Sequence, residues 1–499
     1  MKRLVSKFTV ATTFAFLALG TVIGVGSAFA QSDPGPRGGS PGAGAPIAGL
    51  NGDQMRFFLN AMNQFTEVEG VALPSPGNGG LGPTFNGNAC SMCHSQPAVG
   101  GTSPSPTAPP LFAPNPQVAV ATLNGAKNTL PLFVMPNGPV REARFKYFYS
   151  SPGDGQFNFF GFKVGGPLDL DDPDGGVHDL FTIAGRSDAP AGCTVAVLPQ
   201  EDFNKAQADN NLALRIPTPV FGLGLIETIS DATILKGFAL TAAARAALGI
   251  RGSPNRSGND GTITRFGWKA QNKSGLMFAG EAYNVEMGIT NELFPNERGF
   301  GGVPPPAACL GSNVGSNPLP EDETNSLASG TADTTQGPSD IEDFSIFMRF
   351  LDQPTPACVI SGQAANCSTS IRNGLTQFTN VGCALCHTPA MMTDASDFAP
   401  AALGNVQANL FSDLLLHHMG DNLNDGISQG AAGPDQFRTS PLWGIGQRVF
   451  FLHDGRTSDL LEAIKAHASN GSEANGVIQK YNQLTQSQKQ DLINFLRSL

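Results

Sequence analysis

Apolar residues recur at helical spacing in two stretches of the chain, each shortly ahead of a pair of cysteines. The residues of the two stretches are Phe58, Met62 and Phe65, and Ile371, Leu375 and Phe378. Intervals of three or four residues place such side chains on one face of an α-helix. The pattern therefore predicts an amphipathic helix before each cysteine pair.

Two more helices with apolar faces are predicted, at Ile341 to Leu351 and at Gln490 to Leu499. Between the helices glycine and proline are abundant, with 60 and 38 residues, and only 14% of the chain is charged. This composition is typical of compact helices joined by irregular segments. The predicted fold class is mainly α with long irregular loops.

Residues 1–30 have the pattern of a secretory signal peptide, with a positively charged start, an apolar stretch from 8 to 25 and the cleavage pattern Ala28-Phe29-Ala30. We expect cleavage before Gln31, with an uncleaved membrane anchor as the alternative. Residues 31–50 are rich in glycine and proline and are expected to form a disordered linker. No later segment reaches the roughly eighteen apolar residues of a membrane span. We therefore expect a periplasmic or extracellular protein without stable membrane insertion after cleavage.

The formal net charge of −11 changes the range of expected partners. An acidic protein is repelled by phosphate backbones, so nucleic acid is not expected as a ligand. The charge is compatible with a basic protein partner.

The motif CxxCH occurs twice, at residues 90–94 and 383–387. Two thiols separated by two residues can form thioethers to both vinyl groups of a haem, while the adjacent histidine ligates the iron. The motifs predict two covalently attached haem c groups, held by Cys90, Cys93 and His94 and by Cys383, Cys386 and His387. A zinc site would need both distant pairs around one ion, and a redox CxxC would leave the two histidines unexplained.

Four cysteines remain: Cys193, Cys309, Cys358 and Cys367. An even number in an exported chain favours disulfides, and four cysteines allow three connectivities. Cys358 and Cys367 are close enough in sequence to close a short loop, which would leave Cys193 with Cys309. A second metal site is the alternative.

The order of helix, haem motif, irregular loops and closing helix is the plan of a cytochrome c domain. We predict two such domains in tandem, 51–352 and 353–499, the first enlarged by insertions around residues 100–210. An internal echo supports a duplication, because Pro219–Gly224 (PVFGLG) is similar to Pro441–Gly446 (PLWGIG).

Residues 165–176 form an acidic segment with four aspartates. Calcium is a candidate ligand, but the twelfth position counted from Asp169 is Leu180, where a calcium-binding EF-hand loop needs a glutamate. A solvated acidic loop is the favoured interpretation.

Four segments, 80–94, 264–297, 413–420 and 437–467, resemble the di-haem oxidoreductases related to bacterial cytochrome c peroxidases, some of which are labelled thiol oxidoreductases. The resemblance implies that one haem receives electrons from a donor protein, such as a small cytochrome c or a cupredoxin. The other haem, with an accessible distal side, would reduce hydrogen peroxide or react with oxygen. The thiol label has little support, because no remaining cysteine pair has CxxC spacing.

The resemblance places the distal ligand of the second haem at His467, in the stretch LLEAIKAH. The rival ligands are His417, His418 and Met419. For the first haem, no histidine occurs between His94 and His178, so its distal side is expected to be open.

By the same resemblance, Trp268 matches the aromatic residue between the haems, and Glu286 matches the acidic residue of the distal pocket. Glu286 would move a proton between the oxygens of peroxide. The structural alternatives are core packing for Trp268 and an ion pair of Glu286 with Lys269 or Lys273. The chain departs from the family at Leu276, where the peroxidases often carry glutamine, and it lacks their removable histidine ligand.

These observations predict an exported di-haem oxidoreductase of peroxidase type. Electrons would enter at the C-terminal haem and pass to the open N-terminal haem. The alternatives are a di-haem cytochrome that only transfers electrons and a di-haem oxygenase acting on an organic substrate. Binding of carbon monoxide separates the electron carrier from the enzymes, and oxygen consumption without peroxide would indicate the oxygenase.

Overall fold

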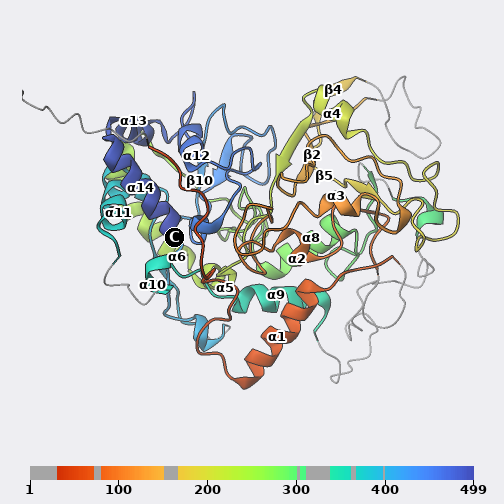
Figure 1. Ribbon diagram of the computed structural model, residues 1–499, viewed down its shortest axis with the longest axis horizontal. Coiled ribbons are helices and arrows are strands. Elements are labelled where there is room, and N and C mark those ends of the chain that lie inside the picture. The colour runs from red at the N-terminus through yellow and green to blue at the C-terminus, as the bar shows by residue number, and fades with distance from the viewer. Residues whose placement is uncertain are drawn as a thin grey trace, which may run out of the picture.

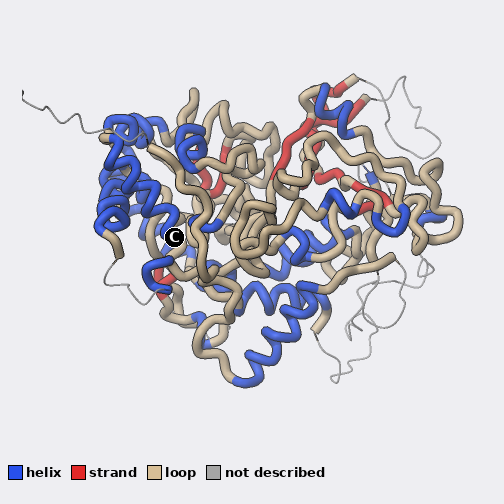
Figure 2. Tube along the Cα trace, in the orientation of Figure 1, coloured by secondary structure: helices blue, strands red, loops and turns tan. Residues whose placement is uncertain are grey.

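The structure is a computed structural model that describes residues 31–71, 80–150, 167–300, 304–310, 338–360, 367–396 and 399–499. The predicted signal peptide, 1–30, lies outside the described residues. Helices and irregular loops dominate the described chain, and the strands are short (Figure 2). None of the helices in this described part combines the length and apolar character needed to cross a membrane.

The α-helices of the described chain are α1 (Gly52–Thr66), α2 (Cys90–Cys93), α3 (Gln117–Val120), α4 (Phe203–Ala208), α5 (Leu223–Thr228), α6 (Asp231–Leu240), α7 (Ala242–Ala246), α8 (Gly275–Met287), α9 (Asp340–Phe350), α10 (Ala357–Ile360), α11 (Thr369–Val381), α12 (Leu460–Ala466), α13 (Asn475–Gln483) and α14 (Gln486–Ser498). The strands are β1 (Thr84–Phe85), β2 (Glu142–Phe145), β3 (Tyr147–Tyr149), β4 (Leu168–Pro173), β5 (Val177–His178), β6 (Phe181–Thr182), β7 (Leu212–Arg215), β8 (Met391–Met392), β9 (Gln407–Ala408), β10 (Leu416–His418) and β11 (Gln436–Arg438). The largest sheet among the described residues has three antiparallel strands in the order β5-β2-β7.

Two helix pairs pack closely, α11 with α14 at the left of the view and α1 with α9 at the bottom (Figure 1). Helix α1 begins with a capping box formed by Asn51 and Gln54, which satisfies backbone donors of its first turn. Its buried Phe58 stacks on Phe347 of α9 with ring centroids 5.5 Å apart. The amphipathic helix predicted before the first CxxCH motif is therefore present and buries the expected face.

The second predicted helix, α11, buries a face that differs slightly from the expected one. Phe378 is buried and packs on Phe495 of α14 at 5.4 Å, but Leu375 is 41% exposed. Gly374 is the residue that meets α14, because a Cβ atom there would overlap the carbonyl group of Asp491. This close approach of the two backbones turns Leu375 toward solvent, so the expectation that Leu375 belongs to the core is wrong.

The two segments of the internal echo meet the two closing helices in the same way. A Cβ atom on Gly224, in α5, would overlap the carbonyl group of Arg349 in α9. A Cβ atom on Gly446 would overlap the carbonyl group of Arg497 in α14. Glycine permits this approach because it has no Cβ. The echo thus has a common structural role in both halves.

The largest hydrophobic core does not end at the predicted domain boundary between residues 352 and 353. Leu410, Leu415 and Trp443 belong to the same buried cluster as residues of α1, α8 and α9. Helices α11 and α14 share a separate cluster around Phe378 and Leu496. The division into domains 51–352 and 353–499 stays a prediction.

Residues 31–50 make defined contacts along their length. Asp33 forms a buried ion pair with Arg497, the backbone of Arg37 donates to the Gly446 carbonyl at 2.9 Å, and Ile47 donates to that of Phe350 at 2.8 Å. The segment therefore runs from α14 to α9, and the expectation that it is a disordered linker is wrong. Composition alone did not reveal these contacts, since each partner lies hundreds of residues away.

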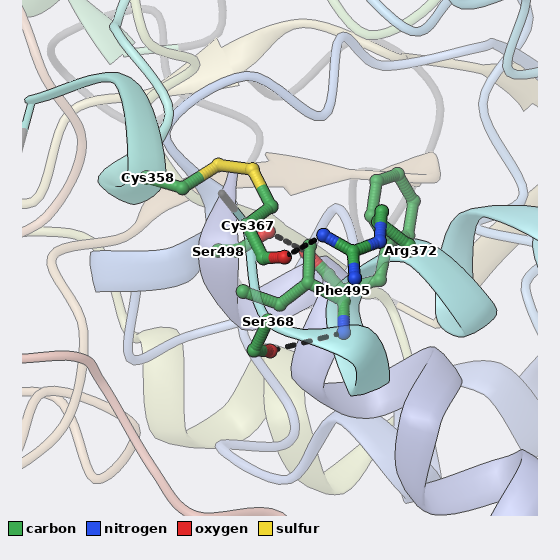
Figure 3. Close-up of a disulfide and its surroundings, with 7 residues drawn as sticks. Cys358, Cys367, Ser368, Arg372, Phe495 and Ser498 are labelled. Atoms are coloured by element: carbon green, nitrogen blue, oxygen red, sulfur yellow. Dashed lines mark hydrogen bonds between the residues drawn. A yellow bond between two sulfur atoms is a disulfide. The ribbon is translucent and has the colours of Figure 1, made fainter. Parts of the chain in front are cut away.

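The structure contains both expected disulfides. Cys193 is bonded to Cys309, and Cys358 is bonded to Cys367. The second bond connects α10 to the residues just ahead of α11, where Arg372 donates to the carbonyl oxygen of Cys367 (Figure 3). The preferred connectivity is confirmed.

Candidate haem sites

The first CxxCH motif opens into a cavity between α2, α8, α9 and β2. Cys90 and Cys93 are the ends of the single turn α2, so both thiols lie on one side of it. His94 follows directly, and its Nδ1 donates to the Gly101 carbonyl at 3.0 Å. This bond leaves the lone pair on Nε2, the tautomer that a metal needs. Burial lowers the pKa of His94 to about 4, so the imidazole is neutral at pH 7.

The second motif lines another cavity, bounded by α11, α12, α13 and α14. Cys383 and Cys386 lie at a 3₁₀ turn that follows α11, and the Nδ1 of His387 donates to the Phe411 carbonyl at 3.1 Å. Burial lowers the pKa of His387 to about 4. The two motifs thus present their histidines in the same tautomer, with the same kind of backbone partner.

His467 lines the second cavity from the C-terminal end of α12. Its Nδ1 donates to the Ala463 carbonyl at 2.7 Å, which again leaves the lone pair on Nε2. Burial lowers the pKa of His467, which keeps the ring neutral. With Nε2 free and in the same cavity as His387, His467 could ligate the iron of a haem held at the second motif.

The rival histidines are engaged elsewhere. Both ring nitrogens of His417 are occupied, by Asp413 and by Glu473, each at 2.9 Å. His418 is exposed, and its Nδ1 binds Asp435. Met419 lines the second cavity and stays the thioether alternative.

One group of the described residues has the spacing of a metal site, formed by Cys386, Asp413 and His417 within 4.8 Å. Burial alone would lower the pKa of His417, but Asp413 and the side chain of Cys386 raise it well above the ordinary value. A charged imidazolium cannot ligate a metal, and the thiol of Cys386 belongs to the CxxCH motif. The group is better described as a buried ion pair beside the second cavity.

The chemistry of both cavities fits haem. Their walls are mainly apolar, as a porphyrin ring requires, and each contains arginines suited to propionate groups. Arg448 is buried at the second cavity, and its Nε has no hydrogen-bond partner. Arg438, also buried there, donates to backbone carbonyls and pairs with no carboxylate of the described residues. At the first cavity, Arg141 and Arg144 line the wall.

Trp268 lies in the wall of both cavities. Its Nε1 donates to the Ile216 carbonyl at 2.9 Å, and its ring meets His453 edge-on at 6.4 Å. Trp268 is therefore more than a core residue, because its side chain lies between two cavities that each contain a CxxCH motif.

Glu286 comes from the last turn of α8 and lines the first cavity. Asn86 donates to its Oε2 at 2.9 Å. The surface ion pair considered for Glu286 does not form, because Lys269 is buried against Asp425 at 3.2 Å and Lys273 pairs with Asp260. Burial raises the pKa of Glu286 well above its ordinary value, and the neighbouring Glu142 raises it further.

Two polar residues of the first cavity were missed at the level of sequence. Leu276, the position of the expected glutamine, is absent from the cavity wall, whereas Gln271 lines it with its Oε1 buried and unpartnered. Glu142, from β2, lines the cavity beside Glu286. No local pattern marks either residue, since the chain path between α8 and the three-stranded sheet brings them there.

The described part of the acidic segment offers calcium no ligand cluster. Asp174 accepts a bond from His178 at 2.8 Å, and Glu201 binds the other ring nitrogen at 2.7 Å. These carboxylates raise the pKa of His178 to about 10 against the effect of burial. Asp174 is therefore the partner of a buried imidazolium, which favours the interpretation without calcium.

A pair of cavities that each hold a CxxCH motif and share a tryptophan defines a di-haem protein. The chain belongs to the family described as "Di-haem oxidoreductase, putative peroxidase", which matches residues 173–499. Two haem groups and oxidoreductase chemistry follow from this membership. No curated protein matches the chain.

Three solved structures are similar to parts of the chain. Hydrazine synthase from Kuenenia stuttgartiensis is 20% identical over 34% of this chain and 59% of its own, with a TM-score of 0.22. A MauG-like protein associated with microbial copper homeostasis is 17% identical over 49% and 78%, with a TM-score of 0.29. The di-haem peroxidase BthA from Burkholderia thailandensis is 16% identical over 51% and 76%, with a TM-score of 0.28. The chain thus spans less than two thirds of the hydrazine synthase chain.

Proposed function

We propose that the protein is an exported peroxidase with two covalently attached c-type haems. Electrons enter at the haem of His387, pass Trp268 and reach the haem of His94. One observation supports this direction: four histidines line the second cavity, His387, His417, His453 and His467, and His467 keeps the lone pair on Nε2 as His387 does, whereas His94 is the only imidazole in the described wall of the first. An iron with two strong axial ligands relays electrons, and one with a free position can bind peroxide.

The overall reaction is H₂O₂ + 2 e⁻ + 2 H⁺ → 2 H₂O. The electrons come from a donor protein, such as a small cytochrome c or a cupredoxin. When bound, the haems supply the redox centres and the position where peroxide binds. The protein supplies the cysteine anchors, holds the imidazoles in the ligating tautomer and excludes a second imidazole from the first site.

Proton handling in the first cavity falls to Glu286. Burial raises the pKa of the Glu286 carboxyl well above its ordinary value, which favours the protonated form that donates a proton to the outer oxygen of peroxide. Gln271 offers an amide in the same cavity. It would take the role of the glutamine that the peroxidases often carry at the position of Leu276. Trp268 provides a short aromatic path between the two cavities.

The experiment uses the mature holoprotein. Reduced protein is mixed with hydrogen peroxide in a stopped-flow spectrometer, and both haems should reoxidise rapidly. Glu462→Gln, a change on the exposed face of α12, serves as the control for loss of one negative charge and should behave as wild type. Intact haems that do not react with peroxide would remove the peroxidase assignment.

A second candidate function is electron transfer without catalysis. Met287 and Met348 line the first cavity, so a thioether could occupy the sixth position there. In that case the ferrous protein would bind no carbon monoxide. Under the peroxidase proposal, carbon monoxide binds one iron per chain.

The proposal includes export through the signal peptide at 1–30, a periplasmic or extracellular location and tandem cytochrome c-like domains. Mass spectrometry of protein secreted by a host that attaches haem c should give an N-terminus at Gln31 and a mass increase of two haems. An N-terminus at Met1 in a membrane fraction would contradict export with cleavage.

A further inference from the structure

A second carboxylate faces the first cavity beside Glu286. Glu142 is the first residue of β2, the central strand of the β5-β2-β7 sheet, and its side chain lines the cavity. Glu142 and Glu286 line the same cavity, and a side-chain hydrogen bond between the two carboxyl groups is one cause of the raised pKa of Glu286. Two carboxyl groups can form such a bond only when one of them carries a proton.

Glu142 is held in place from its own strand. Arg144, two residues along β2, donates through Nε to Oε1 of Glu142 and through Nη1 to the Gly175 carbonyl at 2.9 Å. Arg215, which lies opposite Glu142 on β7, is already paired with Asp425 at 2.7 Å. Arg144 is therefore the arginine that bonds Glu142 directly, while Arg215 acts on it through charge alone.

Asn86 holds the Glu286 carboxyl group in place. The backbone N–H of Asn86 donates to the Glu286 carbonyl at 2.7 Å, and its side chain donates to Oε2 at 2.9 Å. The Oδ1 of Asn86 in turn accepts from the Leu180 backbone at 2.8 Å. With both partners fixed, the two carboxyl groups are kept in contact by separate elements, α8 and β2.

The remaining charges around the pair do not neutralise it. Burial is the largest cause of the raised pKa of Glu286, and the charges of Glu142 and Asp179 raise it further. Arg141, Arg215 and Glu281 also line the cavity, and Arg141 donates to the carbonyls of Phe133 and Asp454. The pair with its one proton therefore carries a single negative charge, stabilised mainly by Arg144.

We propose that Glu142 and Glu286 act as one proton-sharing pair that both accepts and donates the proton moved during peroxide cleavage. This inference rests on the proposed peroxidase function. The pair takes the proton from the oxygen of peroxide nearer the haem and delivers a proton to the outer oxygen. The O–O bond breaks, and the outer oxygen leaves as water with the electron pair of that bond. Two electrons from the donor protein and two protons from solvent convert the other oxygen to the second water.

A pair of carboxyl groups can both accept and donate a proton, which one protonated carboxyl group cannot do. A Glu286 that is already protonated can donate but has no capacity to accept the first proton. Glu142 supplies the base while Glu286 supplies the acid, and the proton count of the pair is unchanged across the cleavage. Glu142 precedes residue 173, so the family match does not contain it.

The test uses Glu142→Gln in the ferric holoprotein, with two measurements. Infrared difference spectroscopy against pH follows the carboxylic-acid C=O band of Glu286, which is identified by its loss in Glu286→Gln. In Glu142→Gln this band should titrate at lower pH than in wild type, because a like charge has been removed. Stopped-flow mixing with peroxide should show reaction slowed about 10²-fold, the lower end for loss of a positioned acid or base.

Three comparisons complete the design. Glu142→Asp retains a carboxylate, so it should recover part of the rate and leave the titration of Glu286 close to that of wild type. Glu142→Ala replaces Glu142→Gln in both measurements if that variant does not fold. Glu462→Gln should change neither measurement. An unchanged titration of Glu286 in the variant without a carboxylate at position 142 overturns the pair, whatever the rate. If wild-type protein does not react with peroxide, the peroxidase function fails, while the infrared titration still decides whether the two carboxyl groups share a proton.

Discussion

Removal of the Asp33 carboxylate should destabilise the protein and loosen the helix that carries His467. Arg497 donates to the two carboxylate oxygens of Asp33 at 2.7 and 2.6 Å, and both side chains are about 95% buried, with 4% and 5% exposure. The backbone N–H of Leu460, the first residue of α12, donates to the same carboxylate at 2.8 Å. Asp33 therefore connects the N-terminal segment to α14 and to the start of α12.

The expected loss of unfolding free energy follows from the state of Arg497 in Asp33→Ala. Arg497 keeps one bond, from Nη1 to the Arg448 carbonyl at 2.9 Å, but its charge stays buried without a counter-ion. Breaking a buried ion pair by removal of one partner costs about 3–5 kcal/mol. The matched control is Asp53→Ala, whose partner Arg56 is exposed, and an exposed pair is worth about 1 kcal/mol or less.

The assay is urea unfolding of the holoprotein followed by far-ultraviolet circular dichroism. Burial alone raises the pKa of Asp33, but the hydrogen bonds from Arg497 and Leu460 outweigh it, and the net pKa lies below 3.8. Because the folded pKa is the lower one, the stabilisation is complete above the unfolded value and is lost as pH falls through the folded one. Wild type and Asp33→Ala should therefore converge in acid. A difference below about 1 kcal/mol at pH 7 would refute this reasoning, since it would match the exposed control.

Three further predictions concern the cavities. Trp268→Phe should slow electron transfer from the second haem to the first, seen in stopped-flow reoxidation as a lag between the two haems; equal rates would exclude the tryptophan path. Glu286→Gln should slow reaction with peroxide by about 10²–10⁴-fold without changing haem content, and an unaffected rate would remove its proton-transfer role. His467→Ala should raise carbon monoxide binding from one to two per chain; an unchanged stoichiometry would assign the ligand to another residue of the cavity, such as Met419 or His453.

The local features of the fold could be predicted from the sequence. Helices α1 and α11, the closing helices and the CxxCH motifs depend on periodicity and short spacing, which a single sequence displays. The disulfides followed from the short interval between Cys358 and Cys367. The role of Trp268 came from family resemblance, and its position at both cavities agrees with that role.

Features that depend on distant contacts could not be predicted. The segment 31–50 has the composition of a linker, but Asp33 finds its partner at the other end of the chain. Gln271 and Glu142 line the first cavity because the fold brings distant segments together, and no sequence motif marks either residue. Leu375 has the spacing of a core residue, and only the approach of two helix backbones at Gly374 explains its exposure.

The central claim is that two covalently attached haems differ in access to small molecules. The most direct measurement is carbon monoxide titration of the fully reduced, mature protein, with haem content determined on the same sample after acid-acetone extraction of any non-covalent haem. We expect two retained haems and one bound carbon monoxide per chain. Fewer than two retained haems, or carbon monoxide bound to neither iron or to both, would contradict it.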